Sequence, residues 1–511
     1  MSEESIPPRW TSAPIGDLCV LVNGRAFKPS DWTDDGLPIV RIQNLNNPDK
    51  PFNRYDGEVL EKFLIDSGEL LFAWSGTPGT SFGAHVWRGG KAVLNQHIFR
   101  VLFDELSLNK ELFRLAINER LNHLISRAHG GVGLRHVTKP VFEATEVSLP
   151  PLPEQHRIVE AIESYLTRLD DAVASLERVQ KNLKRYRASV LKAAVEGRLV
   201  PTEAELARQE GREFEPANVL LKRILKERRQ RWEEAELAKM KAKGKEPKND
   251  KWKEKYKEPV APDTSELPEL PEGWVWTCVD ALADPIRSVT YGVVKLGDEH
   301  DGGVPTLRSS NVRHLSLDLG YVKPISPEIA KSYRRTELVG GEVLVTVRGT
   351  LGGIAVAPPC CAGFNISREV AMIALVDTKL GPGLANLIAS SALQSWMMRH
   401  AKGITYRGVN IETLKQLPIP LPPLKEQQQM ARTIDRHLSF EVSCMKSCEA
   451  TQLRLQRLRQ SILKWAFEGK LVDQDPADEP ASVLLERIKA ERAALEAQKK
   501  ANKKKTSRRK K

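Results

Sequence analysis

An internal repeat is the feature that most constrains how this chain can fold. The phrase LPPLPEQ begins at residue 149 and returns as LPPLKEQ at residue 421, which is 272 positions later. At the same interval, SVLKAAVEGRLV from residue 189 returns as SILKWAFEGKLV from residue 461. A repeat at this interval implies two copies of a whole structural unit, so the chain is expected to contain two related halves.

The region before each repeated phrase is related to its counterpart much more weakly. GLPIVRIQNLN from residue 36 resembles GVPTLRSSNVR from residue 303, and SGELLFAWSGT from residue 67 resembles GGEVLVTVRGT from residue 340. GGVGLRHV from residue 130 corresponds to KGITYRGV from residue 402. This contrast indicates that the repeated phrases keep a common role, while the regions before them have been free to differ.

Each repeated phrase opens a long helical pattern. The first prolines impose extended backbone, whereas Pro153 suits a first helical turn and Gly197 suits a C-cap. Apolar residues then recur at every seventh position, with a second column three residues later, which predicts an a/d seam over about five heptads. In the first helix the columns are Ile162, Leu169, Leu176, Leu183 and Val190, and Tyr165, Ala172, Val179, Tyr186 and Ala193. In the second helix the same positions hold Ile434, Glu441, Cys448, Leu455 and Ile462, and His437, Cys444, Thr451, Leu458 and Trp465, so the ends of this seam are apolar and its middle is not.

An apolar stripe of this kind has to be buried, and the other helix is the obvious partner. At ~1.5 Å per residue the first rod would be about 65 Å long. We predict an intramolecular antiparallel pair of helices. The alternative is that each helix packs only on its own domain.

The regions before the helices are typical of β-rich domains with some helix. GELLFAW and GEVLVTVRG indicate short strands opened by a turn, and residues 109–128 have apolar side chains at helical spacing. The sequence therefore predicts an α+β chain, with two β-rich mixed domains separated by two long antiparallel coiled-coil helices and an internal pseudo-twofold repeat. The predicted segments are a first domain at 1–148, a first helix at 149–200, a charged helical extension and linker at 201–266, a second domain at 267–420, a second helix at 421–472, and a charged helix with a basic tail at 473–511.

Composition indicates which class of partner the chain is expected to bind and in which compartment it is expected to lie. Lys and Arg number 78 against 66 Asp and Glu, and the resulting net charge of +12 favours a polyanionic partner such as nucleic acid. Nine of the last thirteen residues are Lys or Arg, so a basic tail on a neutral protein is the alternative explanation. We find no signal peptide, no apolar run long enough to cross a bilayer and no zinc spacing among the six cysteines, so we expect a cytoplasmic protein without membrane contact.

The motifs of common enzymes are absent from the sequence. It contains no phosphate-binding loop, no dinucleotide-binding glycine motif, no nucleophile elbow and no HExxH metal motif. Cys444 and Cys448 have the spacing of a chelating pair on one helix face, but without further ligands nearby they fit better as small seam residues. We therefore expect a chain that is not an enzyme by itself. A self-sufficient nuclease would need a carboxylate cluster that the sequence does not place convincingly.

Two variable regions, each followed by LPPLxEQ, a heptad helix and EGxLV, resemble the specificity subunit of a type I restriction–modification system. The resemblance covers about residues 8–490. It implies that each variable region is a target recognition domain that binds one half of a bipartite site in double-stranded DNA. It also implies that the helices separate these domains and dock two methyltransferase (modification) subunits, which together with a restriction subunit supply catalysis. S-adenosylmethionine, ATP and magnesium would then be bound by those partners, and this chain would hold no cofactor or metal.

Residues that contact bases are expected on loops near strand ends. Arg and Lys pair with guanine, and Asn and Gln pair with adenine. Positions that match between the two domains are as well explained by a role in the fold, so mismatched pairs such as Gln43 with Ser310 and Ser75 with Arg348 are the better candidates. The full set of DNA-binding candidates is Arg41, Gln43, Asn44, Ser75, Arg135, Arg308, Ser310, Asn311, Arg313, Arg348 and Arg407. The main competing hypothesis is a non-catalytic scaffold whose two modules on a coiled coil bind other proteins.

Overall fold

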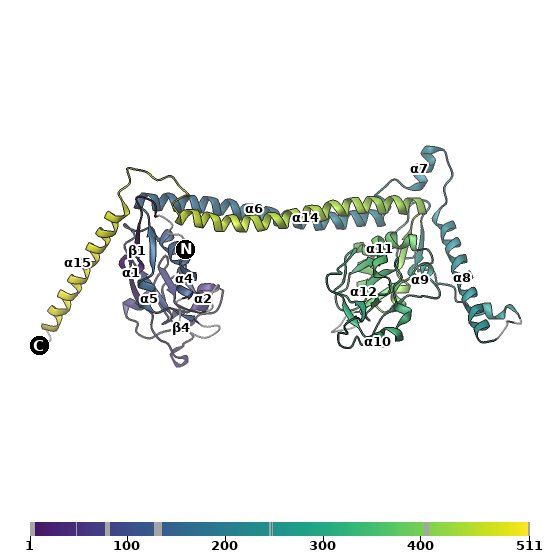
Figure 1. Cartoon of the computed structure of the whole chain (residues 1–511), viewed down its shortest axis with the longest axis horizontal. Coiled ribbons are helices and arrows are strands. Elements are labelled where there is room, and N and C mark those ends of the chain that lie inside the picture. Colours follow the sequence, from purple (N-terminus) through teal and green to yellow (C-terminus); the bar gives the residue numbers. More distant parts are fainter. Residues whose placement is uncertain are drawn as a thin grey trace. The chain divides into compact units, whose positions relative to one another are not determined.

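The computed structural model describes residues 6–47, 49–76, 82–126, 135–244, 247, 249–402 and 408–508. The chain forms two compact units. One unit contains Met1–Leu176 and Ala450–Lys511, and the other contains Glu177–Glu449. Each unit holds one β-rich domain and segments of two long helices, labelled α6 and α14 in Figure 1. The predicted α+β class with two β-rich domains is confirmed.

The first domain is built on two four-stranded sheets and a two-stranded ribbon. One sheet is antiparallel and has the order β2 (Val20–Asn23), β10 (Ile98–Leu102), β6 (Leu70–Ala73) and β8 (Gly83–Val86). The other has the order β4 (Asn53–Tyr55), β3 (Leu37–Val40), β9 (Ala92–Leu94) and β5 (Leu64–Ile65). The ribbon pairs β1 (Thr11–Pro14) with β12 (Glu146–Leu149). The accompanying helices are α1 (Ile15–Leu18), α2 (Ile42–Asn46), α3 (Lys110–Glu119), α4 (Leu121–Ser126) and α5 (Lys139–Glu143).

The second domain repeats this topology. Its antiparallel sheet has the order β14 (Thr290–Tyr291), β22 (Val370–Ile373), β19 (Val343–Thr346) and β20 (Ile354–Val356), and its ribbon pairs β13 (Val275–Cys278) with β23 (Pro418–Leu421). A three-stranded sheet has the order β18 (Lys323–Ile325), β15 (Val304–Leu307) and β21 (Asn365–Ile366). The β15–β21 pair is parallel, as is its counterpart β3–β9. The hairpin and helices that complete the domain are β16 (Val312–Arg313), β17 (Ser316–Leu317), α9 (Val279–Leu282), α10 (Pro327–Ser332), α11 (Gly381–Ala389), α12 (Ser391–His400) and α13 (Ile411–Lys415).

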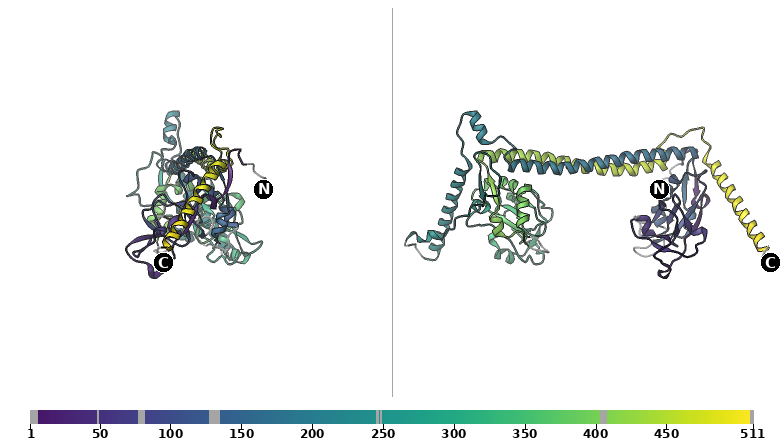
Figure 2. Two further views of the ribbon diagram at one scale, coloured as in Figure 1. Left: turned by 90° about the vertical axis from the view of Figure 1, so that its left-hand side faces the viewer. Right: turned by 180° about the vertical axis from the view of Figure 1, so that it is seen from behind.

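The two long helices pair within each unit. They are α6 (Leu152–Val195) and α14 (Leu424–Phe467), and they run side by side in opposite directions (Figures 1 and 2). In the first unit their buried side chains form a cluster that includes Ile158, Ile162, Leu169, Ile462 and Ala466. In the second unit, side chains of both helices join the core of the second domain; they are Val190, Leu191, Ala194, Met430 and Ile434. The predicted antiparallel pair is confirmed, and each helix also packs on a domain.

The buried stripe of α6 matches one predicted column and corrects the other. Ile162, Leu169 and Val190 are buried as expected, whereas Tyr165 and Val179 are 43% and 44% exposed. The second column lies four residues after the first instead of three, and it consists of Leu166, Val173, Gln180, Arg187 and Ala194. Steps of three and four residues both flank a stripe on a helix with 3.6 residues per turn. Because Gln180 and Arg187 are polar, the apolar pattern in the sequence did not indicate that this column belongs to the buried stripe.

The structure explains why the phrase LPPLxEQ occurs twice. In the first unit Trp10 Nε1 donates to Glu154 Oε1 at 3.0 Å, and Gln155 Nε2 donates to the Pro150 carbonyl at 3.0 Å. Glu154 and Gln155 are 1% and 0% exposed. The glutamate thus ties the start of the domain to the helix, while the glutamine holds the proline turn that precedes it.

The second unit has the same arrangement of hydrogen bonds. Trp274 Nε1 donates to Glu426 Oε1 at 3.0 Å, and Gln427 Nε2 donates to the Pro422 carbonyl at 2.8 Å. Each tryptophan ends a four-residue turn that begins with proline, since the Trp10 and Trp274 amides donate to the carbonyls of Pro7 and Pro271. These buried bonds fix the junction between domain and helix, which is the common role that the sequence indicates.

Glu426 makes the second junction sensitive to pH. The pKa of Glu426 is raised to about 7, mainly by burial and also by the nearby Glu203 and Glu205 carboxylates, whereas hydrogen bonds from the Glu203 amide and Trp274 lower it. Because this pKa lies above that of an unfolded glutamate, the folded unit binds the proton more tightly, and its stability falls as pH rises from 4.5 to about 7 and above. Between pH 5.5 and 8.5 the group should cost about 2 kcal/mol. Thermal unfolding at both pH values should show this loss in the wild type and its absence in Glu426→Gln. Equal pH dependence in the two proteins would contradict the assignment.

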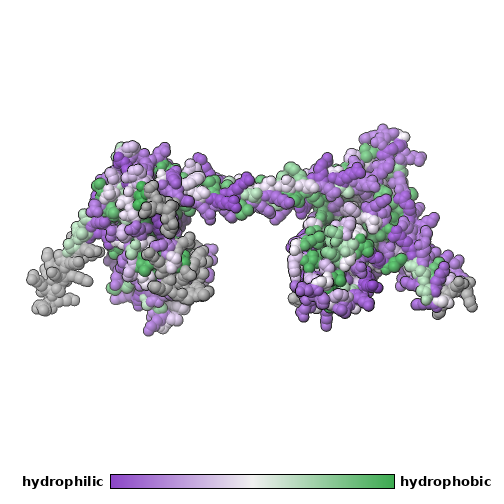
Figure 3. All heavy atoms as spheres, in the orientation of Figure 1, coloured by the Kyte–Doolittle hydropathy of each residue, from purple (hydrophilic) through white to green (hydrophobic). Residues whose placement is uncertain are grey.

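The charged extension after α6 is a packed part of the second unit. It contains α7 (Glu203–Glu210) and α8 (Ala217–Ala242), whose outer surface is largely hydrophilic in Figure 3. Leu220 and Ile224 of α8 nevertheless lie in the core of the second domain. Arg228 is 6% exposed, and its Nε donates to the Ala283 carbonyl at 3.1 Å. Much of the region predicted as an extension and linker therefore packs on the second domain and stabilises it.

The helix after α14 has the same role in the first unit. It is α15 (Ala481–Arg508), and Leu484, Leu485 and Ile488 belong to the core of the first domain. Arg492 donates to the Gly16 carbonyl, as Arg228 does to the Ala283 carbonyl. Each domain is thus completed by the helix that follows the other repeated phrase. The starts of these two helices are alike in sequence, since PANVLLKRI from residue 216 resembles PASVLLERI from residue 480. No helix in the described part of the chain is long and apolar enough to cross a membrane.

A buried ion pair joins the two long helices in the second unit. Arg187 donates to Glu441, which is 2% exposed and occupies a predicted seam position. Removing one partner of such a pair leaves a buried charge, whereas replacing both with apolar residues is often neutral. Chemical denaturation should therefore show that Glu441→Ala costs about 2–4 kcal/mol, and that Arg187→Met combined with Glu441→Leu restores most of this loss.

The first unit supplies a matched control for that prediction. Arg459 stands 272 positions after Arg187 and pairs with Asp170, but their side chains are 47% and 66% exposed. Asp170→Ala should cost less than about 1 kcal/mol, because exposed pairs contribute little. Equal costs at the two pairs would show that burial does not govern the energy of this contact.

Candidate nucleic-acid interface

In the first domain, aromatic and polar side chains gather beside the ends of β6 and β10. Trp74 follows β6, His97 precedes β10, and His136 belongs to β11 (Arg135–His136), which pairs with β7 (Ser75–Gly76). The Trp74 ring centroid lies 5.3 Å from that of His97 and 5.9 Å from that of His136. Gln96 Nε2 lies 3.3 Å from His97 Nε2. Backbone bonds hold the cluster, since the Trp74 amide donates to the His97 carbonyl and the Val137 amide donates to the Trp74 carbonyl.

The second domain has the same backbone arrangement with different side chains. The Val347 amide donates to the Glu369 carbonyl at 2.8 Å, and the Val409 amide donates to the Val347 carbonyl at 3.0 Å. Arg348 pairs across a β-bridge with Gly408, as Ser75 does with His136. Around this bridge lies a cavity of about 560 Å³, lined by Arg348, Gly349, Arg368, Glu369, Lys402, Gly408, Val409 and Asn410.

Asn44 and Asn311 hold matching loops in the two domains. Asn44 is 2% exposed, accepts from the Arg41 amide at 3.2 Å and donates to the Lys50 carbonyl at 3.2 Å. Asn311 is 4% exposed and accepts from the Arg308 amide at 3.0 Å. Its Nδ2 donates to the carbonyls of Asp318 and Tyr321 at 2.9 and 2.7 Å. Both amides are used inside the loop, so in this conformation they position neighbouring residues and do not present a free edge to a base.

The remaining candidates of the first domain differ in burial and in position. Arg41 is half-buried, with its guanidinium 5.6 Å from the centroid of Trp32, and Gln43 is half-buried in α2. Ser75 is 3% exposed, so in this conformation its side chain does not present a free edge to a base. Arg135 lies in β11, paired with Gly76, but its side chain is outside the described structure.

The remaining candidates of the second domain differ in exposure. Arg308 is half-buried, while Ser310 and Arg348 are exposed. Arg313 is exposed and lies 3.4 Å from the Asp318 carboxylate. Ser309 connects this loop to the cavity, because its amide and hydroxyl both donate to Glu369 Oε2, at 3.3 and 2.7 Å. The structure thus brings the Arg308–Asn311 loop and Arg348 to one surface, and Arg407 lies outside the described residues.

Electrostatics favour the neutral form of His97 in the first cluster. Burial lowers the pKa of His97, and the nearby His136 and Arg41 lower it further. A neutral imidazole has one donor and one acceptor nitrogen, which suits hydrogen bonding to a base edge. The second surface is instead strongly charged, since three cations and one carboxylate line its cavity.

Several residues of these surfaces are not among the DNA-binding candidates that the sequence predicts. They are Trp74, Gln96, His97, His136, Arg368, Glu369 and Lys402. A signal was present, because Gln96 and His97 stand 272 positions before Arg368 and Glu369, which is the interval of the repeat. Polar residues that mismatch at that interval, directly before matching strands, would have identified both positions.

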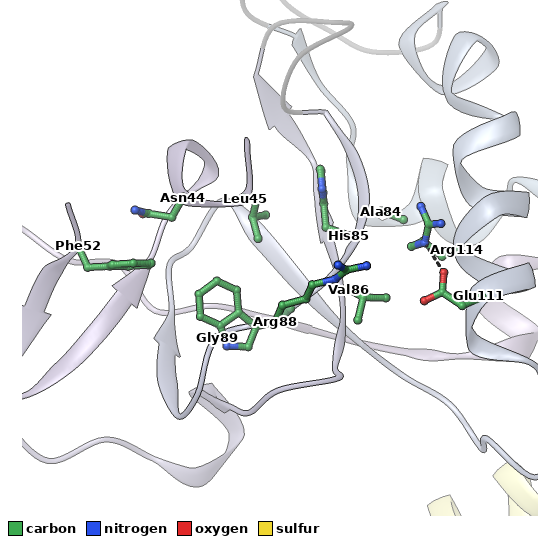
Figure 4. A pocket seen from close by; sticks show the side chains of 11 residues that line it. Asn44, Leu45, Phe52, Ala84, His85, Val86, Arg88, Gly89, Glu111 and Arg114 are labelled. Carbon is green, nitrogen blue, oxygen red and sulfur yellow. Dashed lines mark hydrogen bonds and ion pairs between the residues drawn. The ribbon is translucent and has the colours of Figure 1, made fainter. Parts of the chain in front are cut away.

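Another cavity, of about 500 Å³, lies between α2, β8 and α3 of the first domain (Figure 4). Its wall includes Phe52, His85 and Arg88, and the Arg114 guanidinium is paired with Glu111 at 2.8 Å. Asn44 also lies at its edge with its amide already bonded within the loop. Because Arg114, Glu111 and Asn44 already bond within the chain, we assign this cavity no ligand.

Comparison with known proteins shows to which family the chain belongs. The family model for the type I restriction modification DNA specificity domain matches residues 7–184 and 295–447, more than half of the chain. The chain belongs to the type I restriction–modification specificity subunits. The EcoBI specificity subunit of Escherichia coli is 28% identical over 98% of this chain and 96% of its own length. The EcoKI specificity subunit of Escherichia coli strain K12 is 24% identical over 99% of this chain and all of its own length.

Solved structures of specificity subunits share the fold. The crystal structure of the HsdS subunit from Thermoanaerobacter tengcongensis covers 92% of this chain with a TM-score of 0.52 and 18% identity. A chain from a study of complex assembly and conformational transition in the type I restriction–modification system covers 91% with a TM-score of 0.58 and 18% identity. This specificity subunit therefore has the fold of its family along nearly its whole length, and its role is DNA recognition.

Proposed function

We propose that each recognition domain of this specificity subunit reads one half of an asymmetric, bipartite DNA site. The observation that carries the proposal is that one backbone scaffold presents different chemistry in the two domains. At matching positions the first domain offers Ser75, Gln96 and His97, and the second offers Arg348, Arg368 and Glu369. Since base edges differ in their pattern of donors and acceptors, different side chains on equal scaffolds imply different half-sites.

The long helices fit the role of a spacer and docking element. Two readers on a common support recognise half-sites at a fixed distance, as dimeric DNA-binding proteins do for palindromes. Side chains such as Tyr165 and Trp465 in the first unit and Phe440 in the second are 43%, 44% and 62% exposed on these helices. Large exposed apolar side chains are typical of surfaces that bind another protein. We propose that methyltransferase subunits dock on them.

Catalysis is proposed to belong to those partners. The modification subunits would transfer a methyl group from S-adenosylmethionine to adenine N6, and a restriction subunit would cleave DNA with ATP and magnesium. This chain would contribute binding and orientation only. A scaffold that binds only proteins is the alternative, and it would show weak, sequence-independent affinity for DNA.

Methylation assays with purified proteins test this proposal. The chain alone should transfer no methyl groups, and the chain with a modification subunit of its own system should methylate adenine in a defined sequence. The modification subunit alone is the control and should lack this sequence preference. Robust methyl transfer by the single chain, or identical products with and without the chain, would contradict the proposal.

A further inference from the structure

Three cations of the second recognition surface have no acidic partner among the residues that the structure describes. Arg348, Arg368 and Lys402 are exposed and line one cavity, and none forms an ion pair with another described residue. Other arginines of the domain are paired, such as Arg287 with Glu342 at 2.8 Å. The guanidinium groups of Arg348 and Arg368 therefore keep their hydrogen-bonding capacity for a partner outside the chain.

A carboxylate in the same cavity argues against simple phosphate binding. Glu369 is half-buried, and Ser309 fixes it through two hydrogen bonds to Oε2. A fixed carboxylate repels phosphate, but its second oxygen remains an acceptor for an amino group. Arginine donors beside a carboxylate acceptor match the major-groove edge of a G·C pair, where guanine O6 and N7 accept and cytosine N4 donates.

We infer that this cavity reads a G·C base pair, with Arg348 or Arg368 on guanine and Glu369 on cytosine. The inference rests on the proposed function and adds the identity of a base pair in the second half-site. The first domain provides the contrast, because Gln96 and His97 replace Arg368 and Glu369 and offer no charge pair for guanine and cytosine. The ammonium group of Lys402 is a compact charge without the paired donors of a guanidinium, so we assign it to a phosphate of the DNA backbone.

Base preference in the full complex tests the inference. The chain with its modification subunit is used to select bound DNA from a random library, for wild type and for Arg348→Ala, Arg368→Ala, Arg368→Lys and Glu369→Gln. We expect at least one arginine variant to lower the preference for guanine at one position of the second half-site by about 5- to 150-fold. Arg368→Lys separates charge from geometry, because lysine keeps the charge but cannot form the paired hydrogen bonds. Glu369→Gln should relax the same base pair, and the first half-site should not change.

Arg335→Ala is the matched control, since it removes an exposed positive charge from the same domain. It should weaken binding to all sequences by a similar factor or leave it unchanged. If the cavity variants altered affinity only uniformly, as the control does, the cavity would bind phosphate and the inference would be wrong, while an intact bipartite preference would leave the proposed function standing. If the wild type selected no sequence, the proposed function itself would fail.

Discussion

Replacing the first recognition domain with that of another specificity subunit should change one half of the recognised sequence and leave the other half intact. The expectation follows from the separate cores of the two domains, which lie in different compact units. The structure also sets the limits of the exchange. Trp10 must stay to donate to Glu154, and the surface that α15 covers through Leu484 and Ile488 must be kept. Because α15 packs on α1 (Ile15–Leu18), where Arg492 donates to the Gly16 carbonyl, residues 20–146 are the segment to exchange.

Sequencing of methylated adenines after the exchange measures both halves at once. The reciprocal exchange of residues 285–417, which keeps α9 and the Ala283 carbonyl in contact with α8, is the control, and it should alter only the other half. A change in both halves after a single exchange would contradict independent reading by the two domains.

Lengthening both long helices should lengthen the gap between the half-sites. One heptad adds ~10 Å, or about three base pairs, but it also rotates the second half-site by roughly 100° around the DNA axis. Three heptads add ~31 Å, close to one full turn of DNA of about 34–36 Å. We therefore expect three added heptads in each helix to shift the gap by about nine base pairs and to retain more activity than one added heptad.

The insertions belong after Gln180 and after Gln452, where they keep the buried stripe of both helices in register. An insertion of four residues in each helix is the control, because it breaks the seven-residue period and should abolish activity. An unchanged gap with full activity after three added heptads would show that the helices do not set the spacing.

The repeat made most of the architecture predictable. The prolines and Gly197 located the ends of the first helix to within a few residues, since α6 runs from Leu152 to Val195 and Gly197 has φ +65°. The strands at GELLFAW and GEVLVTVRG became β6 and β19, and the helical spacing after residue 109 became α3 and α4. In each case a local signal, such as a turn residue or a periodicity, agreed with the tertiary structure.

Long-range packing was less visible in the sequence. Nothing local in α15 indicates that Leu484 and Ile488 complete the first domain, because the segment reads as a charged helix. The contact between Trp10 and Glu154 joins residues 144 positions apart, and the repeat was the one sign of its importance. The recognition surfaces could be predicted in part, since the loops that carry Arg308 and Arg348 were identified from the sequence. The contact of Glu369 with Ser309 in the first of these loops could not be predicted, because it joins residues far apart in the chain.

Selection from random-sequence DNA directly tests whether this subunit recognises an asymmetric, bipartite site. The chain bound to its modification subunits is incubated with a random library at physiological salt, and the retained DNA is sequenced. We expect a single asymmetric site, in which two different specified halves are separated by a gap of fixed length and unspecified sequence. Retention of DNA without sequence preference, or of one continuous or palindromic motif, would contradict it.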